Sequence, residues 1–205
     1  MESKSMNYES EVFVTQFPVV KRFMYHLVYS RTFRHSYVAH GLQCEFWTHT
    51  IDAHLLQAAI CWSMVFGADG VNATHWTKLS KSEAEGLERS FQGGLESALK
   101  TPWRDWKKYR KQVTEFRNKF AAHRDLEYDN PVPRFDLALQ TAFYYDEWIR
   151  QVIAPDTFEE PPLRKSAEQL QNGATVLAEV LIQSTLKTEA NELGATLDAL
   201  RVPVS

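Results

Sequence analysis

Residues 43–66 read QCEFWTHTIDAHLLQAAICWSMVF and form the most regular apolar pattern in the chain. Apolar side chains recur there at steps of three or four residues, which is the period of an α-helix with one buried face. Gly67 follows directly and is a plausible residue for a helix end. The pattern therefore predicts a long helix from Gln43 to Phe66 with a wide apolar face.

Similar but weaker apolar periodicity appears on both sides of this helix. A helix is expected to begin at Pro18, in its first turn, and Ser80 with Glu83 matches a capping box that starts another. Thr101 and Pro102 have the residue types of a cap and a first helical position. Further helices are expected over residues 134–153 and 163–188, separated by proline-rich breaks at 129–133 and 155–162. With no strand-like alternation, the fold class is all-α: a helical bundle of five or six helices.

The length and the breaks suggest one domain with an extension. The 205 residues suffice for a single core. We expect a flexible leader over residues 1–16, a helical bundle over 17–153, and a C-terminal helical extension over 154–205 packed on the same domain. The tail from Glu189 is weakly patterned.

Composition limits the classes of function. The net charge is −3 and the pI about 6.2, so binding to a polyanion would have to come from a local patch. Cys44 and Cys61 are the only cysteines and have no CxxC spacing, which suits a reducing compartment. The longest strongly apolar run, Leu55 to Phe66, is too short to span a membrane, and the N-terminus has no secretory signal. We expect a cytoplasmic protein without membrane contact.

A local basic patch does exist between residues 103 and 124. Only Asp105 and Glu115 oppose its eight cations, which are Arg104, Lys107, Lys108, Arg110, Lys111, Arg117, Lys119 and Arg124. On a helix, one stripe gathers Lys107, Arg110, Thr114, Arg117, Ala121 and Arg124, and a second stripe gathers Trp106, Tyr109, Val113, Phe116 and Phe120. A helix with one basic and one apolar face can neutralise phosphates. The alternative is a solvated face whose cations pair with acids elsewhere in the chain.

This basic segment ends in Arg117, Asn118 and His123, which combine a fixed cation, an amide and an imidazole. On a straight helix Arg117 and His123 lie about 120° apart and roughly 9 Å along the axis. They can form one site only if the helix ends near His123 or a twofold partner supplies a second copy. Otherwise His123, seven residues after Phe116, is a core histidine. Arg34 and His40 repeat the spacing, so the spacing alone is not specific.

The stretch Arg117 to Asp125, RNKFAAHRD, resembles the Arg-polar-x4-His signature of HEPN domains (higher eukaryotes and prokaryotes nucleotide-binding). The wider pattern resembles the abortive-infection branch of that superfamily. It includes the segment Trp47 to Asp52 and the run from Phe66-Gly67 through His75-Trp76 to Leu79. The resemblance covers residues 17–153.

The resemblance implies a bundle that forms a homodimer in which two such motifs meet. It implies a metal-independent endoribonuclease, of a toxin or antiviral kind, with RNA as substrate and an antitoxin as a further partner. His123 would be the general acid/base, Arg117 the phosphate anchor, and Asn118 the polar group that orients them. RNA supplies its own nucleophile, the 2′-OH, so no cofactor or metal is needed. The nucleic-acid contacts are expected from Lys107, Arg110, Lys119 and Arg124.

Two other functions stay open. One is a non-catalytic HEPN-like module that binds nucleotide or RNA, or only mediates dimerisation. The other is purely structural, with His123 buried and Arg117 paired to an acid of its own subunit. A metal site is not expected, because Cys44, His49 and His54 are five residues apart and do not align on one helix face. His75 and Trp76 are expected to serve packing.

Overall fold

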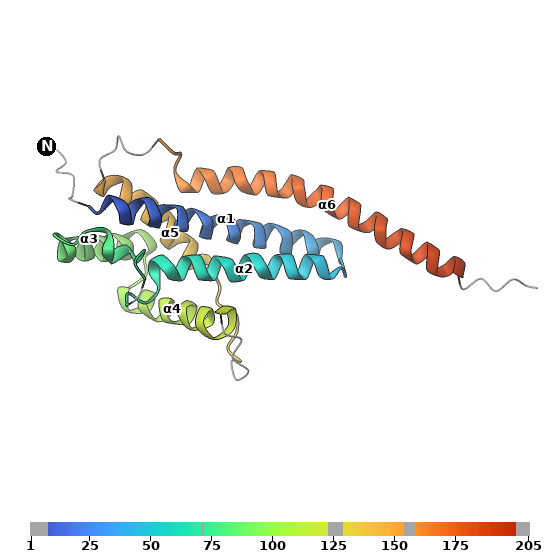
Figure 1. Cartoon of the computed structure of the whole chain (residues 1–205), viewed down its shortest axis with the longest axis horizontal. Helices are drawn as coiled ribbons and strands as arrows, with labels where there is room; N and C mark the ends of the chain where they lie inside the picture. Colours follow the sequence, from blue (N-terminus) through green and yellow to red (C-terminus); the bar gives the residue numbers. More distant parts are fainter. Residues whose placement is uncertain (1–7, 71, 123–128, 154–158, 200–205) are drawn as a thin grey trace, which may run out of the picture.

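The computed structural model describes residues 8–70, 72–122, 129–153 and 159–199 (Figure 1). Within these ranges the chain forms six α-helices, two shorter helical segments and no strand, which confirms the all-α bundle. The elements are α1 (Ser10–His40), α2 (Glu45–Phe66), the 3₁₀ segment η1 (Trp76–Leu79), α3 (Ala84–Leu99), α4 (Trp103–Phe116), the π-helical segment η2 (Arg117–Ala122), α5 (Asp136–Val152) and α6 (Leu163–Ala199). None of these helices is long and apolar enough to cross a membrane.

A long antiparallel hairpin of α1 and α2 forms the axis of the molecule (Figure 1). The chain reverses at Gly41, whose φ of +60° lies in the left-handed region that glycine adopts without strain. Helix α6 runs along α1 on one side of the hairpin, and α4 lies on the opposite side (Figure 1). Two surfaces on opposite sides of one hairpin are thereby available for different contacts.

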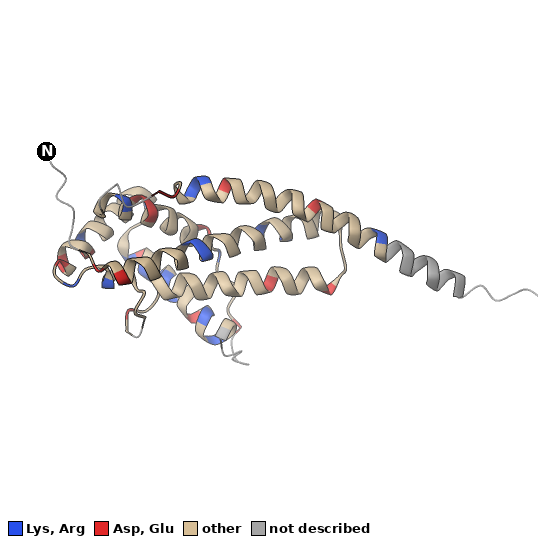
Figure 2. Ribbon diagram, turned by 45° about the horizontal axis from the view of Figure 1, so that its top comes forward, with Lys and Arg blue, Asp and Glu red and all other residues tan. Residues whose placement is uncertain are grey.

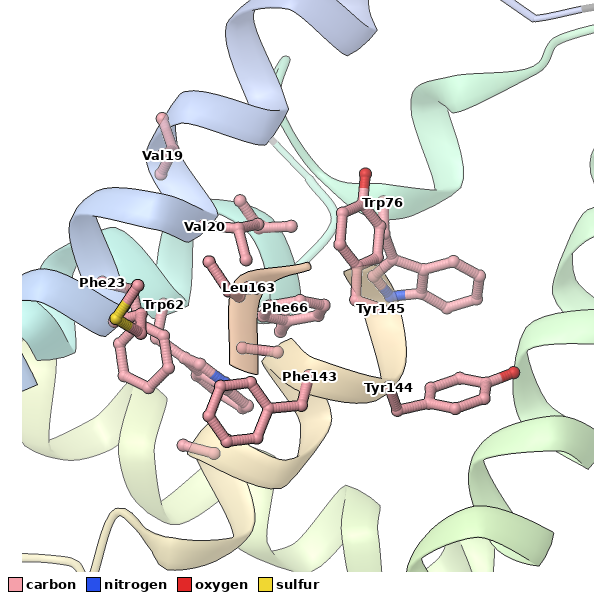
Figure 3. Packing of buried hydrophobic residues seen from close by; sticks show 14 of the residues in the cluster. Val19, Val20, Phe23, Trp62, Phe66, Trp76, Phe143, Tyr144, Tyr145 and Leu163 are labelled. Atoms are coloured by element: carbon pink, nitrogen blue, oxygen red, sulfur yellow. The ribbon is translucent and has the colours of Figure 1, made fainter. Parts of the chain in front are cut away.

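The main core lies where α2 ends and where α3, α4 and α5 gather around the hairpin (Figure 3). It is rich in aromatic side chains, which bury large apolar areas. Trp76 stacks on Phe91 with ring centroids 4.1 Å apart, and the fully buried Trp106 stacks on Trp103 at 4.5 Å. Trp106 also donates a hydrogen bond to Thr141 Oγ1 at 3.0 Å. The hydrogen bond joins α4 to α5, and the Trp106 ring also lies 6.3 Å from that of Trp62, which joins α4 to the hairpin.

A second, smaller cluster lies at the other end of the hairpin, and we call it the distal core. Its buried members are Phe33, Leu42, Trp47, Ile51, Ala178 and Ile182. The last two belong to α6, whose small Ala178 lets the helix approach α1 and α2 closely. The Trp47 Nε1–H donates to Thr185 Oγ1 at 3.2 Å and adds a polar link to α6. The distal core thus attaches the middle of α6 to the hairpin.

The start of α6 is held by a buried carboxylate of α5. Asp146 is 1% exposed and accepts hydrogen bonds from the Leu163 N–H at 2.8 Å and from Arg150 Nε at 3.0 Å. A carboxylate at a helix N-terminus satisfies a backbone donor that has no partner within the helix. From the sequence alone, Asp146 is expected to be a solvated acid beside Glu147. In the structure its buried carboxylate instead fixes where α6 begins.

Several helix boundaries differ from those expected. The leader expected over residues 1–16 is helical from Ser10, and Phe13 and Gln16 are buried. Pro18 therefore lies inside α1 rather than in its first turn. Likewise, the weakly patterned tail is helical as far as Ala199. Pro102 takes the cap position of α4, and the Ser80 hydroxyl accepts from the Glu83 N–H at 3.2 Å just before α3.

One close approach in the main core depends on a glycine. Tyr144 of α5 lies against α3 and donates a hydrogen bond to the carbonyl of Phe91 at 3.2 Å. Its hydroxyl occupies the place where a Cβ of Gly94 would stand. Burial of this side chain raises the pKa of Tyr144 to about 12. The neighbouring Gly93, by contrast, faces open space.

Candidate nucleic-acid interface

Helix α4 has the two faces that its sequence predicts. Trp106, Val113 and Phe116 are buried in the main core, and Tyr109 and Phe120 pack against it. The Tyr109 hydroxyl donates to the carbonyl of Arg134 at 2.8 Å, and burial raises the pKa of Tyr109. These contacts fix the rotation of α4 about its axis. On the opposite face Lys107 and Lys111 are exposed and Arg110 is half-buried. Figure 2 marks the lysine and arginine positions along the ribbon in blue.

A groove of about 390 Å³ follows this exposed face. Its lining residues are Ala68, Lys107, Arg110, Lys111, Thr114, Glu115 and Asn118. The α4 members follow Lys107 at steps of three, four, seven and eight residues, so they lie on one side of the helix, and Asn118 follows from the next helical segment. The groove therefore presents three cations, one hydroxyl and one amide against a single carboxylate. We call it the α4 groove.

The cations of α4 fall into two groups by their partners. Arg104 and Lys108 lie 3.5 and 3.3 Å from the Asp105 carboxylate, and Lys119 lies 4.0 Å from that of Glu115. Among the residues that the structure describes, no carboxylate lies within ion-pair distance of the three cations that line the groove. Pairing with acids of the same chain therefore accounts for the first group and leaves the groove cations available to an external anion.

The type of helix changes at Arg117, where the Arg117–His123 motif begins. Regular α-helix ends at Phe116, and Arg117 to Ala122 form a π-helix, a wider turn closed by i→i+5 hydrogen bonds. Such segments are rare and often occur at functional sites. Arg117 lies half-buried outside the groove, and its Nε is buried without a hydrogen-bond partner in the described structure. Asn118, next in sequence, is exposed and lines the groove.

Behind the groove, a buried histidine anchors the segment after α2. His75 is 1% exposed, its Nε2–H donates to the Gly67 carbonyl at 3.1 Å, and its Nδ1 accepts from the Thr77 N–H at 3.3 Å. Burial, with help from Arg110 and Lys78, lowers the pKa of His75 to about 4 against the opposing effect of Asp69. The imidazole is therefore neutral near pH 7. It packs beside Trp76, as the sequence suggests, and does not line the groove.

The residues predicted for the site are only partly brought together. Lys107, Arg110 and Asn118 share the α4 groove, whereas Lys119 is exposed, lies outside it and faces Glu115. His123 and Arg124 lie outside the described residues. The earlier pair, Arg34 and His40, is exposed near the end of α1, and the His40 ring bonds to the Ser36 carbonyl at 2.9 Å.

Sequence reasoning left two groove residues out of the predicted site. Lys111 lies four residues after Lys107 and so shares its side of the helix, which the helical period alone could have indicated. Thr114 also lines the groove, and its Oγ1 is buried without a hydrogen-bond partner in the part of the chain that is described. Thr114 already belongs to the predicted basic stripe, and Lys111 adds one more charge beside it.

Nothing in the described residues gathers three or more histidine, cysteine, aspartate or glutamate side chains as metal ligands. Comparison with protein-family models, with curated proteins and with solved structures finds no match to this chain. The resemblance to HEPN domains therefore rests on the Arg117–Asp125 motif and on the accompanying sequence pattern.

Proposed function

We propose that this chain binds RNA through the α4 groove and, as a HEPN-like protein, cleaves it without a metal ion. The observation that carries the binding step is the set of three groove cations, Lys107, Arg110 and Lys111, without an acidic partner among the described residues. Cations held on a rigid helix and free of internal ion pairs release counterions when they meet phosphates, which drives binding.

The groove suits a phosphate backbone in its chemistry as well as its charge. Arg110 brings a forked donor that matches phosphate oxygens, and the two lysines bring compact charges. The amide of the exposed Asn118 can donate further hydrogen bonds to a phosphate or a ribose. Arg110 also lies over the Trp106 ring at 5.9 Å, which restrains its orientation.

Cleavage would use the 2′-OH of the RNA as nucleophile. In this proposal the 2′ oxygen forms a bond to the adjacent phosphorus while the P–O5′ bond breaks, which leaves a 2′,3′-cyclic phosphate and a 5′-hydroxyl. His123 transfers the proton that leaves the 2′-OH and the proton that the 5′ oxygen takes up, Arg117 stabilises the negative charge on the phosphoryl oxygens, and Asn118 orients the reacting groups. The π-helical turn over Arg117–Ala122 supports the proposal, because such turns often occur at functional sites. A homodimer that juxtaposes two motifs would complete the site, and an antitoxin would be the partner that restrains it.

The binding step is tested by removing the two groups of cations separately. The variant Lys107→Gln, Arg110→Gln, Lys111→Gln loses the groove charges. The control Arg104→Gln, Lys108→Gln, Lys119→Gln loses three charges that face acids on the same helical segment. Affinity for single-stranded RNA is measured against salt concentration. The logarithm of the association constant decreases as the logarithm of the salt concentration rises. We expect this decrease to become less steep, by about 2 in slope, in the groove variant only. Equal effects of the two variants would refute the groove as the binding site.

The cleavage step has its own test. The purified protein is incubated with RNA in EDTA, alongside His123→Ala and Arg117→Ala. Cleavage that His123→Ala lowers by roughly 100-fold or more supports the catalytic proposal. No cleavage by the unaltered protein, or cleavage unchanged in His123→Ala, contradicts it.

A second function is favoured by what the groove contains. Among the residues that the structure describes, its lining provides groups that bind phosphate and no histidine that could act as acid and base. An RNA-binding module without catalysis would therefore use the same residues. It predicts the salt-dependent binding described above together with intact RNA in every cleavage reaction.

A further inference from the structure

A second concave site lies on the other side of the hairpin, between α1, α5 and α6. It has a volume of about 450 Å³, within the range of small-molecule sites. Helix α4 contributes nothing to it, and it shares no residue with the α4 groove. We call it the α6 cleft.

The floor of the α6 cleft is apolar. Leu27 and Val28 of α1, Phe143 of α5 and Ala167 of α6 line it, and all four side chains are at least nine-tenths buried. Water is poorly held on such a floor, so an apolar group that covers it gains free energy from the area removed from solvent. The α4 groove lacks a comparable floor.

Polar groups line the cleft above this floor. The hydroxyl residues Thr32 and Ser36 are largely buried, and Gln171 lies on the α6 wall. Two arginines, Arg31 and Arg164, and one carboxylate, Glu168, also line the cleft. A few polar groups above an apolar floor are the usual composition of a site for a small organic molecule.

Both arginines are positioned by neighbours that leave most of their donors unused. The Arg164 guanidinium lies over the Phe143 ring at 4.5 Å, and its distance to Glu147, 3.7 Å, is too long for a hydrogen bond. Among the described residues, Arg31 donates one hydrogen bond, 2.9 Å long, to Asp136. That carboxylate also serves Arg134 at 3.1 Å, so it neutralises Arg31 only in part. Each guanidinium has five N–H donors, and those remaining can form paired bonds with an oxyanion.

We propose that the α6 cleft binds a small organic anion with an apolar body. The apolar part covers Leu27, Val28 and Phe143, and the acidic group lies at the rim between Arg31 and Arg164. Arginine forks favour a carboxylate, sulfonate or phosphate ester over a neutral head group. The ligand contacts three helices at once, and its binding therefore holds α6 against α1 and α5.

The probe for this proposal is 8-anilinonaphthalene-1-sulfonate, an aromatic anion that fluoresces when it leaves water. N-phenyl-1-naphthylamine is its matched control, with the same aromatic frame and no sulfonate. We expect the full chain to bind one sulfonate probe, on the order of tenfold more tightly than the neutral probe. Equal affinity for the two probes, or fluorescence that does not saturate near one probe per chain, would overturn the proposal.

Two pairs of variants locate the binding. Gln171→Trp fills the cleft from an exposed position, whereas Asn172→Trp places the same side chain on exposed helix outside it. We expect only the first to weaken both probes, by about tenfold or more. Arg164→Gln removes a cleft charge, and Lys165→Gln removes an adjacent charge outside the cleft. Only Arg164→Gln is expected to weaken the sulfonate probe, by roughly fivefold, while it leaves the neutral probe unchanged.

All four positions are exposed, so thermal unfolding followed by circular dichroism is expected to be similar in each variant and in the unaltered chain. Identical binding in Gln171→Trp and Asn172→Trp would place the probe elsewhere and refute the cleft. Identical binding in Arg164→Gln and Lys165→Gln would refute the role of the rim arginine.

Discussion

The two ends of the α1–α2 hairpin are stabilised in different ways. At one end, the main core packs the helices from α1 through α5 together, with stacked aromatic rings and buried polar contacts. At the other, the distal core consists of six buried side chains, and α6 is the third helix to reach it. The α4 groove lies on a helix that packs into the main core. The α6 cleft also has its floor in the main core, but one of its walls is α6. The two sites therefore share one core and differ in whether α6 contributes to them.

The largest expected effect comes from a tryptophan of the main core. Trp106→Ala removes a fully buried side chain that packs against Trp103 and bonds Thr141. We expect the free energy of unfolding to fall by about 3–5 kcal/mol. Urea unfolding monitored by circular dichroism measures it. A loss below 1 kcal/mol would mean that the main core does not carry the stability assigned to it.

Acid should weaken the same end of the molecule. Because the pKa of His75 is lowered to about 4 in the fold, the unfolded chain binds more protons between about pH 4 and 6.5. The stability that the neutral imidazole contributes is complete above pH 6.5 and is lost as the pH falls toward 4, by about 3 kcal/mol.

Urea titrations at several pH values test this expectation. In His75→Gln the slope of the unfolding free energy between pH 4 and 6.5 should become shallower. An unchanged slope in that variant would show that other groups cause the acid sensitivity.

A smaller effect is expected from a buried polar contact in the main core. The Tyr145 hydroxyl bonds to Gln16 Oε1, and Gln16 Nε2 donates to the Thr74 carbonyl at 3.0 Å. Tyr145→Phe leaves the glutamine oxygen without this donor in a buried site. Calorimetry should show a destabilisation of about 1–3 kcal/mol. A stabilised variant would mean that the contact is less favourable than an apolar replacement.

The smallest effect should appear at the distal core. Ile182→Val removes one buried methyl group where α6 meets the hairpin. We expect a cost of about 0.5–1.5 kcal/mol. Hydrogen exchange should accelerate along α6 and stay unchanged at α4 and α5, because opening of the far end need not disturb the main core. Uniform acceleration over the whole chain would show that the two ends unfold as one unit.

The sequence predicts the helices where burial follows the helical period. Residues 43–66 and 134–153 match α2 and α5 closely, because one apolar face repeats throughout each. The start of α1 was missed because one of its buried residues, Gln16, is polar and has its partners on the segment before η1 and on α5. A partner far away in the sequence is invisible to a local pattern.

The candidate site was likewise predictable only where its residues follow the helical period. Lys107 and Arg110 share the groove because they lie on one side of the regular helix α4, and Asn118 joins them from the π-helical segment that follows. Arg117 is the first residue of that segment and lies outside the groove, and the sequence pattern of α4 does not indicate the change of helix type. The α6 cleft could not be predicted, because three helices far apart in sequence contribute to it.

The two neighbouring glycines of α3 carry a consequence for sequence variation. An alanine at Gly93 meets nothing within 4 Å and should stabilise the helix by about 0.5–1 kcal/mol, as it restricts the unfolded chain. An alanine at Gly94 collides with the Tyr144 hydroxyl. In a saturation library selected for folded protein, position 93 should therefore accept more residues than position 94. Two adjacent glycines of one helix therefore differ in the substitutions that they tolerate.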